Sequence, residues 1–169
     1  MASAHYWILT ISFAIAASPA VAREDRLDLR GTWVMDSAYE IKGDGTRTTN
    51  YGQHPNGLLM IDAEGRYTLQ IFRVDRTRFA LDDKGRGTAE EYRDAAMGSS
   101  THFGTVAVDA ARHLMTFDVK GASFPNWEGK RQIREYQYLD GLLTYAVPAS
   151  ASGNGTVAYS LWRRLSTRQ

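Results

Sequence analysis

The feature that most constrains the fold of this chain is a succession of short β-rich segments separated by turn signals. Each segment is rich in Val, Ile, Thr, Tyr, Phe or Trp, the residues that suit a pleated surface. Most connections are short, and short connections make consecutive strands antiparallel. The expected strands are at about Thr32–Ile41, Gly57–Asp62, Arg66–Val74, Thr101–Asp109, Leu114–Lys120, Lys130–Leu139, Leu142–Val147 and Thr156–Leu165.

The strongest turn signal is Asp140-Gly141, which lies between two apolar runs. A two-residue hairpin of type I′ needs positive φ at both central positions, and Asp-Gly tolerates this conformation well. We therefore expect a tight hairpin at this point and an up-and-down order of strands.

A sheet of about eight strands is expected to close into a barrel. An open sheet of that size would expose two edges and an apolar face, whereas closure removes the edges. The chain contains no cysteine, which excludes disulfides, so the core alone must stabilise it. The sequence predicts an all-β, antiparallel up-and-down barrel of about eight strands, with a two-sheet sandwich as the alternative.

One polar stretch, residues 75–100, interrupts the β pattern and carries a helix signal at Thr88–Gly98. Thr88 can cap the helix, Glu91 can reach back to the cap, and Gly98 suits the end of the helix. We expect one short helix in this long loop, lying over a rim of the sheet.

The first residues have the layout of a secretory signal peptide. The apolar run Ile8–Ala17 is followed by small residues up to Ala22, and charged residues begin at Arg23. The run is shorter than the roughly 20 residues that a membrane-spanning helix needs, which disfavours an uncleaved anchor. We expect cleavage after Ala22, export to the periplasm or the medium, and a single domain over residues 23–169.

Charge and motifs exclude several classes of function. Lys and Arg number 20 against 19 Asp and Glu, so nothing electrostatic favours nucleic acid or an anionic membrane. No phosphate-binding glycine loop, dinucleotide fingerprint or nucleophile elbow occurs, and no cofactor is expected. The histidines show no metal-ligand spacing, so we expect no metal site.

Two segments resemble known barrel families. Gly31-Thr32-Trp33 is similar to the Gly-x-Trp that opens the first strand of lipocalins. The resemblance implies that Trp33 closes the barrel floor beneath an arginine from the end of the chain. Arg163 or Arg164 is the candidate, and Arg163 is the one we assign.

The second resemblance is more specific and joins segments spread over residues 29–165. It is carried by Ser123–Arg134, Leu139–Leu143, Gly57–Ile61 and Glu64–Tyr67. Together these resemble the bacterial and fungal lipocalin-like domain family. The resemblance implies a lipocalin-type barrel for nearly the whole mature chain, but it implies little about function.

Strand alternation assigns candidate interior residues. Phe117 and Tyr145 fall on inward-facing sets, and Arg134 and Tyr136 share one face of their strand. If that face is interior, Arg134 would bind a carboxylate or carbonyl oxygen and Tyr136 would donate a hydrogen bond. The alternative places Arg134 in solvent or against Asp118.

Two further residues complete the candidate ligand site. Trp127, in a Pro-Asn-Trp loop, lines the mouth of the barrel or plugs its end. His102 alternates with Gly104, Val106 and Val108, so it is expected to face inward. Because imidazole titrates near neutral pH, His102 is also the candidate general acid or base.

Three functions remain open from the sequence. The first is an exported protein that holds a small apolar molecule with a polar head inside the barrel. The second is a small barrel enzyme of isomerase, cyclase or hydratase type, using His102, Arg134 and Tyr136. The third is an envelope-associated structural protein whose side chains fill the barrel.

Overall fold

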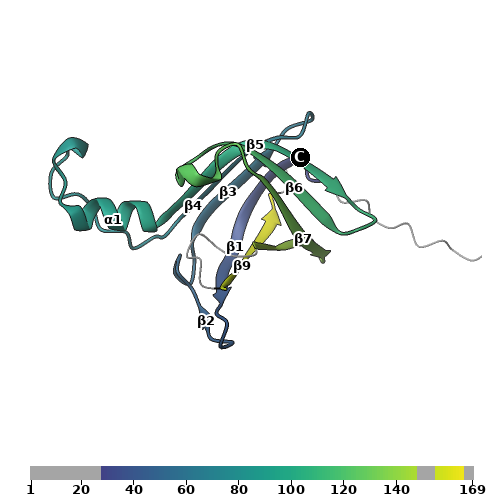
Figure 1. Ribbon diagram of the computed structural model, residues 1–169, viewed down its shortest axis with the longest axis horizontal. Helices are drawn as coiled ribbons and strands as arrows, with labels where there is room; N and C mark the ends of the chain where they lie inside the picture. Colours follow the sequence, from purple (N-terminus) through teal and green to yellow (C-terminus); the bar gives the residue numbers. More distant parts are fainter. Residues whose placement is uncertain (1–27, 148–154, 166–169) are drawn as a thin grey trace, which may run out of the picture.

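Each strand of the computed structural model pairs antiparallel with the next strand of the sheet, and the last strand returns to the first (Figure 1). The strand order is β2-β1-β3-β4-β5-β6-β7-β8-β9, with an additional β1–β9 pairing. Eight long strands thus form a closed antiparallel barrel, as the sequence predicts. The structure describes residues 28–147 and 155–165, and the predicted signal peptide with its cleavage after Ala22 lies outside them.

All eight predicted strands are present, with ends within two residues of those expected. The two-residue strand β2, which pairs with the end of β1, was not predicted. The strands are β1 (Gly31–Ile41), β2 (Arg47–Thr48), β3 (Asn56–Ile61), β4 (Arg66–Phe72), β5 (Ser99–Asp109), β6 (Leu114–Ala122), β7 (Arg131–Leu139), β8 (Leu142–Val147) and β9 (Val157–Arg164). The helical elements are η1 (Lys84–Arg86), α1 (Ala89–Met97) and η2 (Pro125–Trp127).

The β1–β9 pairing closes the barrel along nearly the full length of both strands. Its register runs from Trp33 opposite Arg164 to Ile41 opposite Val157, with an irregularity between Met35 and Ser37. An extra residue at such a bulge shifts the alternation of side chains and bends the strand. Accordingly Trp33 and Met35 are buried before it, and Ala38 is buried after it.

The Asp140-Gly141 hairpin has the predicted geometry. Asp140 has φ of 52° and Gly141 has φ of 75°, the two positive values that a type I′ turn requires. The turn fixes the register of β7 on β8, with Leu139 opposite Leu142.

Large side chains fill the interior of the barrel around Trp33. Trp33, Trp162, Phe117, Leu59, Met115 and Leu143 have no exposed surface. Burying each such side chain contributes about 1.5–3 kcal/mol to folding. The indole nitrogen of Trp33 donates to the Leu29 carbonyl at 2.8 Å, which fastens the lead-in chain beneath this end of the barrel.

The arginine that covers Trp33 is Arg164, and the assignment of Arg163 was wrong. The Arg164 guanidinium lies 5.7 Å from the Trp33 ring centre and donates to the Arg30 carbonyl. Arg163 points outward to Asp36, 3.0 Å away. Neighbouring residues of a strand face opposite sides, so only one of the two arginines can reach the floor. Gly31 lies beside the Arg164 side chain and has φ of +118°.

Helix α1 has the predicted capping box, in which Thr88 accepts from Glu91 N and the Glu91 carboxylate accepts from Thr88 N. Its expected place over a rim of the sheet was wrong. Figure 1 shows α1 extending away from the ends of β4 and β5. The helix presents no wide apolar stripe to pack on the barrel, and only Glu91 of its residues is buried.

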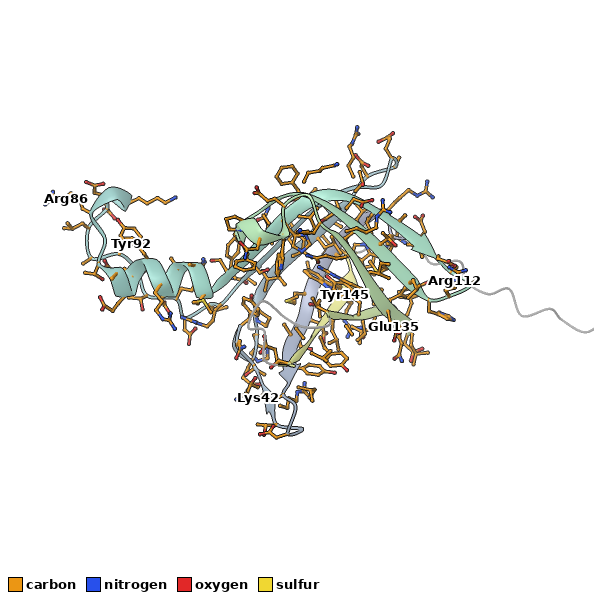
Figure 2. All side chains as sticks on the ribbon, in the orientation of Figure 1. Lys42, Arg86, Tyr92, Arg112, Glu135 and Tyr145 are labelled. Carbon is orange, nitrogen blue, oxygen red and sulfur yellow. The ribbon has the colours of Figure 1, made fainter. Side chains whose placement is uncertain are left out.

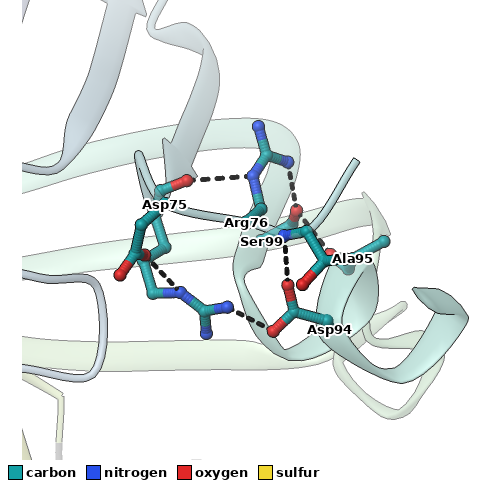
Figure 3. Close-up of polar contacts among 7 residues, drawn as sticks. Asp75, Arg76, Asp94, Ala95 and Ser99 are labelled. Atoms are coloured by element: carbon teal, nitrogen blue, oxygen red, sulfur yellow. Dashed lines mark hydrogen bonds and ion pairs between the residues drawn. The ribbon is translucent and has the colours of Figure 1, made fainter. Parts of the chain in front are cut away.

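A polar cluster instead joins the base of α1 to the barrel (Figure 3). The Asp94 carboxylate accepts from the Arg73 side chain and from Thr77 N. Arg76 donates to Ser99 Oγ, which donates to the Ala95 carbonyl. Helix α1 is therefore held to the barrel by hydrogen bonds and ion pairs rather than by apolar packing.

Gly104 in β5 allows a test of how closely β5 and β6 are packed. A Cβ at this position would lie 2.0 Å from the Asp118 carbonyl oxygen on β6, so Gly104→Ala must push two paired strands apart. We expect it to lower the free energy of unfolding by about 2–3 kcal/mol, measured by urea denaturation. Gly43→Ala is the control, because nothing lies within 4 Å of its Cβ position, and it should change stability by less than about 0.5 kcal/mol.

Candidate functional site

The two ends of the barrel differ. One end, here called the floor, carries Trp33 and the tight turns at residues 62–65, 110–113 and 140–141. The other end, here called the mouth, carries the long connections at residues 42–55, 73–98 and 123–130. Long loops at one end of a rigid barrel are the usual place for a binding site.

Arg134 lies inside the barrel wall, which resolves the choice between the two faces of β7. Its side chain is buried with 3% exposure, and Figure 2 shows the Tyr145 side chain inside the barrel while Glu135 points outward. Asp118, the alternative partner, instead pairs with Arg131 at 2.8 Å. No described carboxylate forms an ion pair with Arg134.

Aromatic rings hold the Arg134 guanidinium in place. Its central carbon lies 4.3 Å from the Phe117 ring centre and 5.1 Å from that of Tyr145. Gln132 Oε1 accepts a hydrogen bond from Arg134 Nη2 at 2.5 Å. Cation–π contacts of this kind stabilise a desolvated cation by about 2 kcal/mol. Burial still lowers the pKa of Arg134, because none of these contacts supplies a full negative charge.

Three buried polar atoms in and beside this guanidinium have no hydrogen bond of good geometry. Arg134 Nε, the Tyr145 hydroxyl and Trp162 Nε1 are buried and have no hydrogen-bond partner among the described residues. Burial raises the pKa of Tyr145, and the nearby Arg134, Trp162 and Ser160 side chains act in the opposite direction. Buried polar groups are nearly always paired, so a group of unpaired donors indicates a place for an acceptor.

His102 lies in the same interior, at 4% exposure. Its Nδ1 is 2.7 Å from the Tyr67 hydroxyl, and its ring packs edge-on against Trp127 at 5.7 Å. Burial, aided by the positive charge of Arg134, lowers the pKa of His102 from 6.5 to about 3. His102 is therefore neutral at physiological pH, and burial likewise raises the pKa of Tyr67.

Trp127 lies at the mouth of the barrel, whereas Tyr136 lies toward the floor. Trp127, from η2 at the mouth, is half-buried and contacts His102 and Phe124. Tyr136 is buried, but its ring contacts His113 in the turn at the floor, 5.8 Å away. Arg134, His102, Phe117, Tyr145 and Trp127 thus form one chain of contacts. Tyr136 pairs with Tyr145 across β7 and β8, but its ring contacts His113 at the floor.

Sequence reasoning did not assign Tyr67, although its signal was present. In β4 the residues Tyr67, Leu69 and Ile71 alternate with polar ones and all three are buried. The ring of Tyr67 contacts both His102 and Phe117. Tyr67 therefore connects the histidine to the arginine site.

A small hollow lies between the wall and the loops at the mouth. It has a volume of about 30 Å³, and its lining includes the small residues Ala38, Ala158 and Ser160 together with larger side chains such as Tyr51 and Ile71. Ser160 pairs with Tyr145 across β8 and β9, which links the hollow to the donor cluster. A space of this size holds one water molecule.

Within residues 28–147 and 155–165, no three His, Cys, Asp or Glu side chains gather in a way that could hold a metal ion. Across the same ranges, no helix is long and apolar enough to cross a membrane.

The chain matches the model of a protein family. The model of the lipocalin-like domain matches residues 30–165. The chain belongs to the lipocalin-like domain family. The residues matched are nearly those over which the sequence resemblance extends, and they include every strand of the barrel.

Comparisons of the lipocalin-like chain with individual proteins are less informative. No curated protein sequence matches it significantly. Among solved structures, a single-residue mutant of the fluorescent protein UnaG is 16% identical, covers 82% of this chain and 97% of its own, and gives a TM-score of 0.38. A protein described as REP1-NXSQ fatty acid transporter is 14% identical, covers 83% and 98%, and gives a TM-score of 0.37. Likenesses this weak support no conclusion about function.

The low pKa of His102 predicts acid sensitivity in this lipocalin-like barrel. The unfolded chain protonates the imidazole near pH 6.5, whereas the folded chain does so near pH 3. Between these values the unfolded state binds more protons, so stability falls as the pH falls. We expect a loss of about 2 kcal/mol from pH 7 to pH 5, measured by urea denaturation.

The control for this prediction is His102→Gln, which keeps an acceptor for the Tyr67 hydroxyl and removes the titrating group. Its stability should change much less over the same pH range, whatever its value at pH 7. An equally steep pH dependence in the wild-type protein and the variant would show that His102 is not the group responsible.

Proposed function

We propose that this barrel binds a small apolar molecule with an anionic head, and that Arg134 holds the head. The observation that carries the proposal is the donor cluster, defined as Arg134 Nε, the Tyr145 hydroxyl and Trp162 Nε1, which are buried and have no hydrogen bond of good geometry among the described residues. A carboxylate is the acceptor that best matches a guanidinium flanked by neutral donors, because it takes several charge-assisted hydrogen bonds at once.

The energetics of burial support an anion at this position. An ion taken out of water costs several kcal/mol unless it is paired, and guanidinium cannot avoid this cost by losing its proton. The aromatic contacts and Gln132 offset part of the cost. A bound carboxylate would supply the missing charge.

The apolar part of the ligand would extend from Arg134 toward the mouth. The floor half of the barrel is filled by Trp33, Trp162 and Leu143, whereas Ala38, Ala158 and Ser160 near the mouth are small. Because the hollow there holds only one water, binding requires the side chains over it, such as Tyr51, to move outward. We further propose that the protein acts after export, in the periplasm or the medium, as its N-terminal sequence suggests.

A second candidate is a barrel that holds no ligand. It is favoured by the dense packing of Phe117, Met115 and Tyr145, which leaves the centre of the barrel filled by side chains. An enzymatic role has less support, because a pKa of about 3 makes His102 a poor base at neutral pH and Tyr136 lies apart from it.

Binding can be tested with a dansyl-labelled undecanoic acid and its methyl ester, by fluorescence titration of the purified protein. We expect the acid to bind and the ester to bind more weakly. Arg134→Met should weaken binding of the acid about 10- to 100-fold, the loss expected for a hydrogen bond to a charged group. Arg134→Met should also be as stable as the wild-type protein or more so, since a buried unpaired charge is replaced by an apolar side chain of similar length.

Arg131→Met is the matched control, because Arg131 lies on the same strand but is exposed and paired with Asp118. It should leave the affinity for the acid unchanged. Equal binding of acid and ester, or equal loss in both variants, would contradict the role of Arg134. If native mass spectrometry finds no retained molecule and no probe binds, the ligand-free barrel is the better account.

A further inference from the structure

Gln132 is the side chain that accepts a hydrogen bond from the buried guanidinium. Its side chain is half-buried, and its Oε1 accepts from Arg134 Nη2. Arg134 itself is buried, so Gln132 bridges the surface and the donor cluster. The sequence analysis assigned no role to Gln132, because a glutamine on a strand carries no signal of a binding site.

The hydrogen bond that Arg134 donates to Gln132 uses Nη2, which together with Nε forms a two-donor edge. A guanidinium presents Nε–H and one Nη2–H in parallel, and a carboxylate accepts both. Arg30 and Asp28 form this side-on pair elsewhere in the chain, with distances of 2.8 Å from Nε and 2.8 Å from Nη2. On Arg134 one Nη2 hydrogen is donated to Gln132, while Nε has no partner among the described residues.

Beside Gln132, β7 has no β8 partner among the described residues. β7 pairs with β8 only from Tyr136 to Leu139, whereas residues 131–135 pair with β6 alone among the described strands. Ala146 and Val147 of β8 pair with β9. The two strands therefore separate on the mouth side of the Tyr136–Tyr145 pair, and the side chain of Gln132 lies in the part of β7 that has no β8 partner.

We propose that Gln132 is the residue that sets the affinity and selectivity of the Arg134 site. Its amide oxygen occupies the position of one carboxylate oxygen, and an incoming carboxylate displaces it to gain both Nε and Nη2. The displacement takes place where β7 leaves β8. This inference rests on the proposed function and adds the residue that the ligand must compete with.

Three variants test this arrangement. Gln132→Ala frees the Nη2 hydrogen, so the dansyl-labelled acid should bind about 3- to 10-fold more tightly, the net contribution of a typical hydrogen bond. Gln132→Glu places a carboxylate of the protein on the same edge, so the acid should bind at least 10-fold more weakly while the melting temperature rises. Gln137→Glu is the matched control, because it makes the same chemical change at an exposed position of β7, and it should alter neither property.

A readout that needs no ligand is the Arg134 Nε–H signal in NMR spectra of protein labelled with ¹⁵N. In Gln132→Glu this signal should move downfield, as the same signal does in wild-type protein on addition of the acid. An unchanged Arg134 signal in Gln132→Glu, together with an unchanged melting temperature, would overturn the proposed geometry.

The outcomes separate this inference from the proposed function. If the wild-type protein binds the acid through Arg134 but Gln132→Ala and Gln132→Glu bind it equally well, the function stands and the role of Gln132 is wrong. If the wild-type protein does not bind the acid but Gln132→Ala does, Gln132 blocks the site as inferred. If neither binds it and the Arg134 signal does not respond, both proposals fail.

Discussion

The pairing of β1 with β9 is the constraint on which the rest of the structure depends. It turns a meander of hairpins into a closed barrel without long open edges, and it brings Arg164 from the end of the chain over Trp33 near its start. The bulge between Met35 and Ser37 shifts which side chains of β1 face inward on its two sides. Before it, β1 contributes large side chains to the packed floor, and after it Ala38 leaves space near the mouth.

Inside the closed barrel, the positive charge of Arg134 has the largest effect on the polar groups around it. Arg134 is buried, with its guanidinium over the Phe117 ring and near Tyr145, and its positive charge helps keep His102 neutral. Because an arginine does not lose its proton, the cost of its burial has to be met by neighbouring rings and dipoles or by an anion. A filled structural barrel would be more stable with an apolar residue there, so the presence of Arg134 favours a binding role.

Much of the fold was predictable because its signals are local. The eight long strands, the Asp140-Gly141 turn and the Thr88 capping box each depend on residues close in sequence. The errors arose where distant parts of the chain meet. Arg163 and Arg164 are adjacent, so composition cannot distinguish them, and only the register of β9 on β1 places Arg164 over the tryptophan. The position of α1 likewise depends on contacts with Arg73 and Arg76 outside the helix.

The sequence by itself determined the architecture, the family and the list of polar residues that could face inward, since alternation and turn chemistry act over a few residues. The tertiary structure alone decided which of those residues meet. It brought His102 and Arg134 together through Tyr67, placed Tyr136 near the floor, and left Gln132 beside the point where β7 and β8 separate. The reason is physical: the tilt and register of strands around a closed barrel decide which inward positions come within hydrogen-bonding distance, and no local pattern encodes them.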